Sequence, residues 1–185
     1  NKNFYKKFQI LKNHGIQKQN STIKKYFWSY KIFSPGYNYR LSDINCALGI
    51  SQLKKLDHII LKRKRIALCY SKEFKNYDNV IKIPKVQKDQ LSAWHLYIVN
   101  IDFNKLKINK NNFIKKLYEK GIVTQVHYIP IFKQPAFKKF KKGQFKNANS
   151  YFSSCLSLPI FYDLSIKQAK YIATTVKLMV KNYKK

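Results

Sequence analysis

The longest regular pattern of apolar residues begins just after Ser42 and continues to about residue 76. Its apolar members recur at the spacing of one helical face: Ile44, Leu48, Leu53, Leu56, Ile60, Ala67, Tyr70 and Phe74. Ser42 fits the N-cap position, and Asp43 places a carboxylate in the first turn. At 1.5 Å per residue such a helix would be roughly 50 Å long. We expect a helix of this length to link two domains.

After Pro84 the pattern changes to shorter segments that predict an alternation of strands and helices. Segments rich in aromatic and branched residues predict strands at 94–102, 122–130 and 156–160. Amphipathic spacing and caps predict helices at 109–121, around Phe137, at 147–155, and after Ser165 to the end. This order indicates an α/β layer, in which helices cover a small sheet.

The first residues also follow a helical pattern. Residues 4–12 are typical of the last turns of a helix, and His14-Gly15 fits its end. Ser34-Pro35-Gly36 is a turn signal. The chain starts with Asn1 rather than methionine and enters this helical pattern at once, so we expect it to be a fragment or a processed product.

A net charge of +30 raises the question of a nucleic-acid partner. The only arginines are Arg40, Arg63 and Arg65, although arginine is favoured for reading bases and for bidentate phosphate contacts. The lysines are spread along the whole chain, and their abundance beside Asn and Ile fits A/T-rich codons. We therefore expect no nucleic-acid partner, and a basic, non-enzymatic binding module remains the alternative.

The cysteines and the apolar runs bear on the cellular compartment of the protein. Cys46, Cys69 and Cys155 are odd in number and lack metal-ligand spacing, which fits a reducing, cytoplasmic setting and no metal site. No apolar run reaches the roughly 20 residues of a membrane span, so we expect no membrane partner.

Two segments carry candidate chemistry. In "GYNYRLSD", Asn38 and Arg40 stand directly before a helix start, where a phosphate would be stabilised. A turn merely fixed by these side chains explains the same residues. In "TQVHYIP", Gln125 and His127 share one face of the predicted strand, on either side of Val126, and Tyr128 lies on the other face. Polar groups at a strand end can bind a sugar or nucleotide, although a strand face that meets water is the simpler reading.

Five segments in this order resemble one family: "LKNHGI", "GYNYRLSDINCALGISQLKKLD", "SAWHLY", "GIVTQVHYIPI" and "LSLPIFY". They are similar to the C-terminal part of the DegT/DnrJ/StrS sugar aminotransferases, and they cover nearly the whole chain. The resemblance implies the C-terminal part of the PLP-dependent aspartate-aminotransferase (type I) fold, with a long linking helix and a small α/β domain. It places the tail of the large cofactor domain and the start of the linking helix in 1–57, and the small domain in 58–185.

The resemblance also implies a function. The cofactor would be pyridoxal 5'-phosphate, and the reaction would move an amino group from glutamate to C4 of a UDP-4-keto-6-deoxy sugar. "SQLKKLD" and "TQVHYIPI" are most similar to members that act in pseudaminic acid biosynthesis. These enzymes are homodimers with shared active sites. Asn38 would reach the cofactor phosphate and the substrate of the partner chain, Arg40 would brace that turn or hold the charge of the substrate, and Gln125, Val126, His127 and Tyr128 would lie against the sugar nucleotide.

Transamination also needs a lysine that forms a Schiff base with the cofactor. In the family it precedes a "GEGG"-like stretch, which this sequence lacks, and the family layout puts it roughly ten to twenty residues before Asn1. We therefore expect no catalytic residue within this chain and no activity from it alone. An inactive remnant of the enzyme is the other reading.

Overall fold

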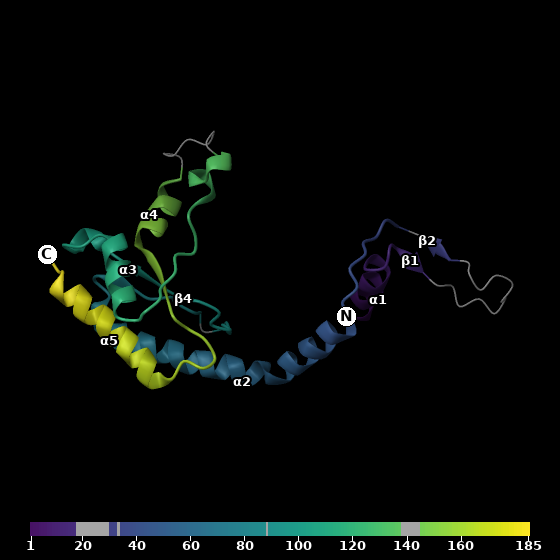
Figure 1. Cartoon of the computed structure of the whole chain (residues 1–185), viewed down its shortest axis with the longest axis horizontal. Coiled ribbons are helices and arrows are strands. Elements are labelled where there is room, and N and C mark those ends of the chain that lie inside the picture. Colours follow the sequence, from purple (N-terminus) through teal and green to yellow (C-terminus); the bar gives the residue numbers. More distant parts are fainter. Residues whose placement is uncertain (18–29, 33, 88, 138–144) are drawn as a thin grey trace. The chain divides into compact units, whose positions relative to one another are not determined.

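The computed structural model describes residues 1–17, 30–32, 34–87, 89–137 and 145–185. The chain divides into two compact units, residues 1–55 and 56–185, and the division falls within one long helix. The helices are α1 (Lys2–Leu11), α2 (Asp43–Phe74), α3 (Lys110–Glu119), α4 (Lys146–Ser154) and α5 (Ile166–Asn182) (Figure 1). Short 3₁₀ turns are formed by Lys75–Tyr77, Phe103–Lys105, Ile131–Lys133 and Pro135–Phe137. The strands are β1 (Ile16–Gln17), β2 (Lys31–Ile32), β3 (Ile81–Lys82), β4 (Tyr97–Ile101) and β5 (Cys155–Leu158).

The first unit is built around the end of α1. β1 and β2 pair antiparallel, with Ile16 opposite Ile32. Gly15 has a φ of +73°, and a Cβ built on it would lie 1.7 Å from the carbonyl oxygen of Ser34. Gly36 approaches from the other side, where its Cβ would lie 2.2 Å from the Gly15 nitrogen. The two glycines therefore let the chain after Pro35 pass directly against the end of α1, and the predicted turn signals at both places have a packing cause.

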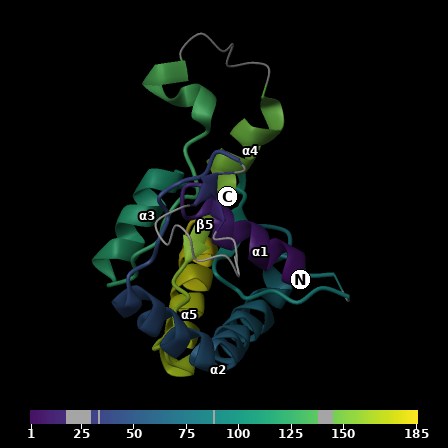
Figure 2. The ribbon, with the colours of Figure 1, turned by 90° about the vertical axis from the view of Figure 1, so that its right-hand side faces the viewer.

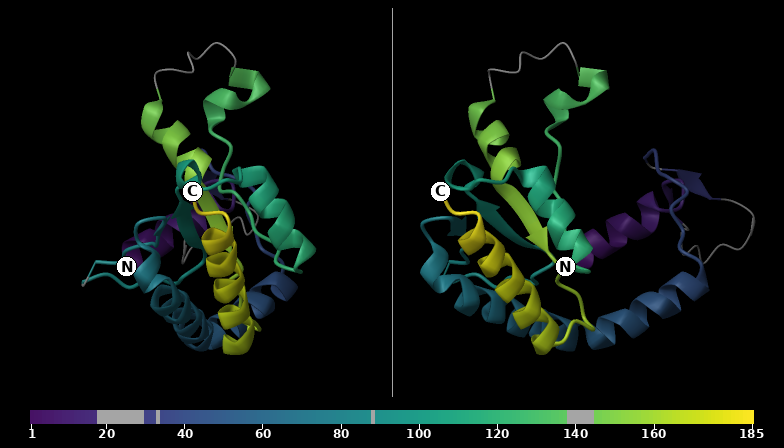
Figure 3. Two further views of the ribbon diagram at one scale, coloured as in Figure 1. Left: turned by 90° about the vertical axis from the view of Figure 1, so that its left-hand side faces the viewer. Right: turned by 60° about the vertical axis from the view of Figure 1, so that its left-hand side comes forward.

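The second unit contains a three-stranded antiparallel sheet in the order β3-β4-β5. Directly opposed residues share a face, so Tyr97, Val99, Leu156 and Leu158 point to the same side. That side meets the C-terminal half of α2, where Tyr70 packs against Tyr97 at 5.0 Å between ring centroids. Helix α5 and this half of α2 lie side by side beneath the sheet (Figure 3). This layer forms the hydrophobic core of the second unit.

Side-chain caps explain why three helices begin where they do, two of them at the predicted residues Ser42 and Ser165. The Ser42 hydroxyl accepts the backbone N–H of Asn45 at the start of α2. Asn109 accepts the N–H of Asn112 at the start of α3, and Ser165 forms a capping box with Gln168 at the start of α5. The predicted buried face of α5 is confirmed: Ala169, Ile172, Ala173, Val176 and Val180.

The strand predictions were less accurate. The predicted strand 122–130 is wrong, because only Gln125 forms a bridge, to Ser157, and the rest of the segment is irregular. β5 offers this segment one bridge, at Ser157, and Pro130 has no N–H to donate. The strand predicted for 94–102 begins only at Tyr97, since Trp94 has a φ of +49°. The strand predicted for 156–160 is β5, and α4 runs directly into it (Figure 2). The pairing strand β3 was not predicted.

An ion pair joins α2 to α5. The ammonium group of Lys177 donates to the carboxylate of Glu73. This hydrogen bond is the main cause that holds the pKa of Glu73 below its ordinary value. The folded chain therefore binds this proton less readily than the unfolded chain does. The resulting stabilisation is present above the ordinary carboxylate pKa and is lost as the pH falls through the lowered pKa.

We predict that Glu73→Gln lowers the free energy of unfolding at neutral pH by about 0.2–1 kcal/mol, the usual range for a partly exposed pair. Below the lowered pKa, where Glu73 is protonated, the variant and the parent chain should have the same stability. Urea unfolding at both pH values measures this. Asp163→Asn, at an exposed carboxylate, is the control and should change neither value. A stability difference of the same size at both pH values would contradict the prediction.

Over the part of the chain that the structure describes, no helix is both long and apolar enough to cross a membrane. The same residues contain no cluster of three or more His, Cys, Asp or Glu side chains that could hold a metal ion.

Candidate functional site

In the first unit, residues 37–40 form an extended segment against the end of α1. The N–H groups of Tyr37 and Tyr39 donate to the carbonyl oxygens of Leu11 and Lys12, at 2.7 and 2.9 Å. The rings of Tyr37 and Tyr39 stack at 4.8 Å with an interplanar angle of 6°. Side chains alternate along an extended chain, so Asn38 and Arg40 project together to the side away from these rings.

Asn38 and Arg40 form a pair of donors. Arg40 Nε donates to the amide oxygen of Asn38 at 2.9 Å, which fixes the orientation of the amide. Both side chains are exposed. Among the described residues, no protein group accepts from the Asn38 amide nitrogen or from the outer guanidinium nitrogens of Arg40. The segment therefore presents a neutral and a cationic donor side by side, which suits a phosphate or carboxylate.

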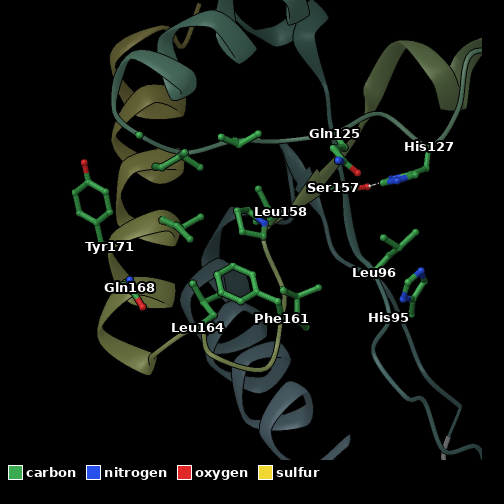
Figure 4. A pocket seen from close by; sticks show the side chains of 16 residues that line it. His95, Leu96, Gln125, His127, Ser157, Leu158, Phe161, Leu164, Gln168 and Tyr171 are labelled. Atoms are coloured by element: carbon green, nitrogen blue, oxygen red, sulfur yellow. Dashed lines mark hydrogen bonds between the residues drawn. The ribbon is translucent and has the colours of Figure 1, made fainter. Parts of the chain in front are cut away.

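In the second unit, a pocket of about 590 Å³ opens beside the end of β5. This size falls within the usual range for small-molecule sites. One end holds Gln125, His127 and Ser157, and the opposite side is formed by α5 with Gln168 and Tyr171 (Figure 4). The floor between them is mostly apolar and contains Ile122, Leu158, Pro159, Ile160, Leu164 and Ile172.

Ser157 organises the polar end of this pocket. It lies in β5 on the face opposite the core, and the residue is 4% exposed. Its backbone exchanges two hydrogen bonds with Gln125, at 2.8 and 3.2 Å. Its hydroxyl lies 2.7 Å from Nδ1 of His127 (Figure 4). Ser157 thus contacts both polar residues that the sequence indicated: Gln125 through its backbone and His127 through its side chain.

A hydrogen bond from the core fixes the turn that follows β5. The buried hydroxyl of Tyr70 donates to the carbonyl oxygen of Pro159 at 2.7 Å. Burial raises the pKa of Tyr70, so the phenol stays protonated and remains a donor. Burial likewise raises the pKa of the neighbouring Tyr97 to about 12, and Tyr97 bonds the Ser71 hydroxyl at 2.9 Å. The core layer therefore fixes the pocket floor.

The predicted site residues fall into two groups. Gln125 and His127 both line the pocket, although the strand expected to carry them is absent. Val126 is half-buried and does not line it. Tyr128 is 74% exposed, and its ring meets the His127 ring edge-on at 4.7 Å. Asn38 and Arg40 belong to the first unit. The predicted site residues are therefore divided between the two units.

Sequence reasoning missed Ser157. The available signal was a single polar residue inside the apolar run "CLSLP", since a hydroxyl buried in a strand needs a hydrogen-bond partner. It also missed the contribution of α5, whose exposed Gln168 and Tyr171 had no pattern to distinguish them from other surface residues.

Comparisons with known proteins agree with this architecture. Among curated relatives, the UDP-4-amino-4,6-dideoxy-N-acetyl-beta-L-altrosamine transaminase of Campylobacter jejuni serotype O:2 is 38% identical over 189 residues, covering 100% of this chain and 47% of that protein. The spore coat polysaccharide biosynthesis protein SpsC of Bacillus subtilis is 33% identical over 181 residues, covering 95% of this chain and 46% of that protein. The chain spans about half the length of the curated relatives it matches.

Solved structures give the same picture. Helicobacter pylori PseC, an aminotransferase involved in the biosynthesis of pseudoaminic acid, superposes with a TM-score of 0.80 at 27% identity, covering 99% of this chain and 47% of PseC. The sugar aminotransferase Spr1654 of Streptococcus pneumoniae, in its PLP-form, gives a TM-score of 0.79 at 28% identity, covering 98% of this chain and 44% of that one. These likenesses confirm the expected aminotransferase fold, of which this chain forms a part.

A family model also matches this chain. The model of the DegT/DnrJ/EryC1/StrS aminotransferase family matches residues 1–177, which is nearly the whole chain. The resemblance seen in the five sequence segments is thus confirmed, and the chain belongs to the DegT/DnrJ/EryC1/StrS aminotransferase family.

Proposed function

We propose that this chain supplies the C-terminal half of a PLP-dependent transaminase that moves an amino group from glutamate to C4 of a UDP-4-keto-6-deoxy sugar. Its relatives named as UDP-4-amino-4,6-dideoxy-N-acetyl-beta-L-altrosamine transaminases support this substrate class. In this proposal residues 1–57 belong to the large cofactor domain and its linking helix, and residues 58–185 form the small domain.

The observation that carries the proposal is the donor pair of Asn38 and Arg40. PLP offers a dianionic phosphate. The segment 37–40 holds the Asn38 amide nitrogen beside the outer guanidinium nitrogens of Arg40, and these donors have no protein acceptor among the described residues. These groups fit a phosphate. When bound, PLP supplies an electron sink for the bond changes at the amino-bearing carbon. Asn38 and Arg40 would hold its phosphate or the charge of the substrate, in a site shared between two copies of the whole enzyme.

The pocket beside β5 would take part of the sugar nucleotide. Gln125 offers an amide and His127 an imidazole at its polar end, and Val126 and Tyr128 border them. These side chains would bind and orient the ligand, and the apolar floor would contact its less polar parts. The lysine that bonds the cofactor would come from the half of the relatives' length that this chain does not span.

A chimera tests the proposal. The N-terminal half of the Campylobacter jejuni transaminase is joined to this chain in place of its own C-terminal half. We expect the chimera to bind PLP, seen as its visible absorbance, and to aminate a UDP-4-keto sugar with glutamate. This chain alone should do neither. An inactive, well-folded chimera would overturn the proposal, and salt-sensitive binding to nucleic acid would then favour the basic binding module.

Within the chimera, Asn38→Ala should weaken PLP binding by about ten- to a hundredfold, because a hydrogen bond to a charged group contributes about 1.5–3 kcal/mol. Titration of the apo-chimera with PLP, followed by its absorbance, measures this. Asn147→Ala, at an exposed position of α4, is the matched control and should leave the affinity unchanged. Equal affinities for the two variants would remove Asn38 from the site.

A further inference from the structure

The hydroxyl of Ser157 has one hydrogen-bond partner among the described residues, which is Nδ1 of His127 at 2.7 Å. Ser157 is 4% exposed, so its hydroxyl has little contact with water. A buried O–H that donates to nothing is unfavourable, whereas an oxygen lone pair left without a donor costs less. The hydroxyl therefore donates, and Nδ1 of His127 accepts.

We infer that Ser157 is a positioning residue that fixes the tautomer of His127. With Nδ1 accepting, the proton of the neutral imidazole resides on Nε2. His127 then offers an N–H donor at the polar end of the pocket, beside the amide of Gln125. A group that accepts hydrogen bonds suits this pair, such as the phosphoryl or hydroxyl oxygen of a nucleoside diphosphate sugar. The choice of ligand rests on the proposed function, but the tautomer does not.

The surrounding geometry supports a fixed ring. The backbone of Ser157 is paired with Gln125 on one side and with Ile98 of β4 on the other. The Tyr128 ring meets the imidazole edge-on at an interplanar angle of 87°. The serine hydroxyl is thus held by the sheet, and the imidazole is held between that hydroxyl and an aromatic ring. A ring confined in this way presents one nitrogen to the pocket rather than alternating between two.

Long-range proton–nitrogen NMR of the imidazole rings tests the inference on the full chain. The chain has only four histidines, so His127 is assigned from one variant, His127→Gln. At a pH where imidazoles are neutral, we expect the His127 spectrum of an Nε2–H tautomer with an accepting Nδ1. Ser157→Ala should give a mixture of tautomers, and Ser157→Thr, which keeps the hydroxyl, should restore the single form. An Nδ1–H tautomer in the parent chain, or an unchanged tautomer in Ser157→Ala, would overturn the inference.

Two further measurements separate the effect of Ser157 on the His127 tautomer from the proposed function of the pocket. Ser154→Ala removes another half-buried hydroxyl of the same unit, which bonds the Asn100 side chain at 3.0 Å, and should leave the His127 spectrum unchanged. Adding UDP to the active chimera should shift the His127 signals, and Ser157→Ala should weaken UDP binding by about tenfold. If the tautomer is as expected but UDP leaves His127 unshifted, the proposed function of this pocket fails while the role of Ser157 stands.

Discussion

Replacing Phe113 with alanine is expected to lower the free energy of unfolding by about 3–5 kcal/mol, a large part of the stability of a domain of this size. Phe113 lies on α3 and is fully buried in the core of the second unit. Its ring packs edge-on against Phe103 at 5.6 Å between centroids. The truncation removes these contacts and leaves a cavity in the core.

Urea unfolding of the full chain, followed by circular dichroism, measures the effect. Tyr118→Ala is the matched control, because Tyr118 lies on the same helix and is 68% exposed. This substitution removes an aromatic ring of similar size, and tyrosine and phenylalanine have similar helix propensities. It should change the free energy of unfolding by less than about 0.5 kcal/mol. If both variants lost the same stability, the core described for the second unit would be wrong.

The helices could be predicted from the sequence because their signals are local. Ser42, Asn109 and Ser165 each supply a cap whose partner lies three residues further on, and apolar residues at helical spacing follow each cap. Both parts of such a signal lie within one turn of the chain. The start of α2 was therefore found to within one residue, and its end to within about two.

The strands depend on partners that are far apart in the sequence. Residues 122–130 have the composition of a strand, but only Gln125 finds a place beside β5, more than thirty residues away. Pairing, rather than composition, decides whether an extended segment becomes a strand. β3 shows the reverse case, since its two residues form a strand only because Ile81 lies opposite Ile101.

The candidate site also contains both local contacts and contacts between residues far apart in the sequence. Asn38 and Arg40 were visible because they precede a helix cap by a few residues, and their mutual hydrogen bond is local. Ser157 joins Gln125 and His127 across the fold, so a single sequence could mark it only as an unusual polar residue in an apolar strand. The ligand groups assigned to all of these residues remain predictions.

The N-terminal half of α2 carries the apolar pattern that first indicated the helix, but it buries none of it. Ile44, Leu48 and Leu53 are 82%, 59% and 69% exposed. The buried residues of α2 begin only at Ile66. Exposed apolar stripes of this kind promote association, because each large side chain removed from water contributes about 1.5–3 kcal/mol.

We therefore expect the chain of residues 1–185 to self-associate, and the triple variant Ile44→Gln, Leu48→Gln, Leu53→Gln to weaken that association by on the order of a hundredfold or more. Light scattering during size-exclusion chromatography over a range of concentrations measures this association.

The variant Lys54→Gln, Lys55→Gln, Lys64→Gln alters exposed lysines of the same helix and is the control. A parent chain that stays monomeric at all concentrations would contradict the expectation, as would equal association of the two triple variants. If the lysine control alone became more monomeric, charge rather than the apolar stripe would drive the contact. The apolar triple variant can also be made in the chimera. If the full-length enzyme covers these three side chains, the variant should lower the free energy of unfolding of the chimera, whereas it should not lower that of this chain alone.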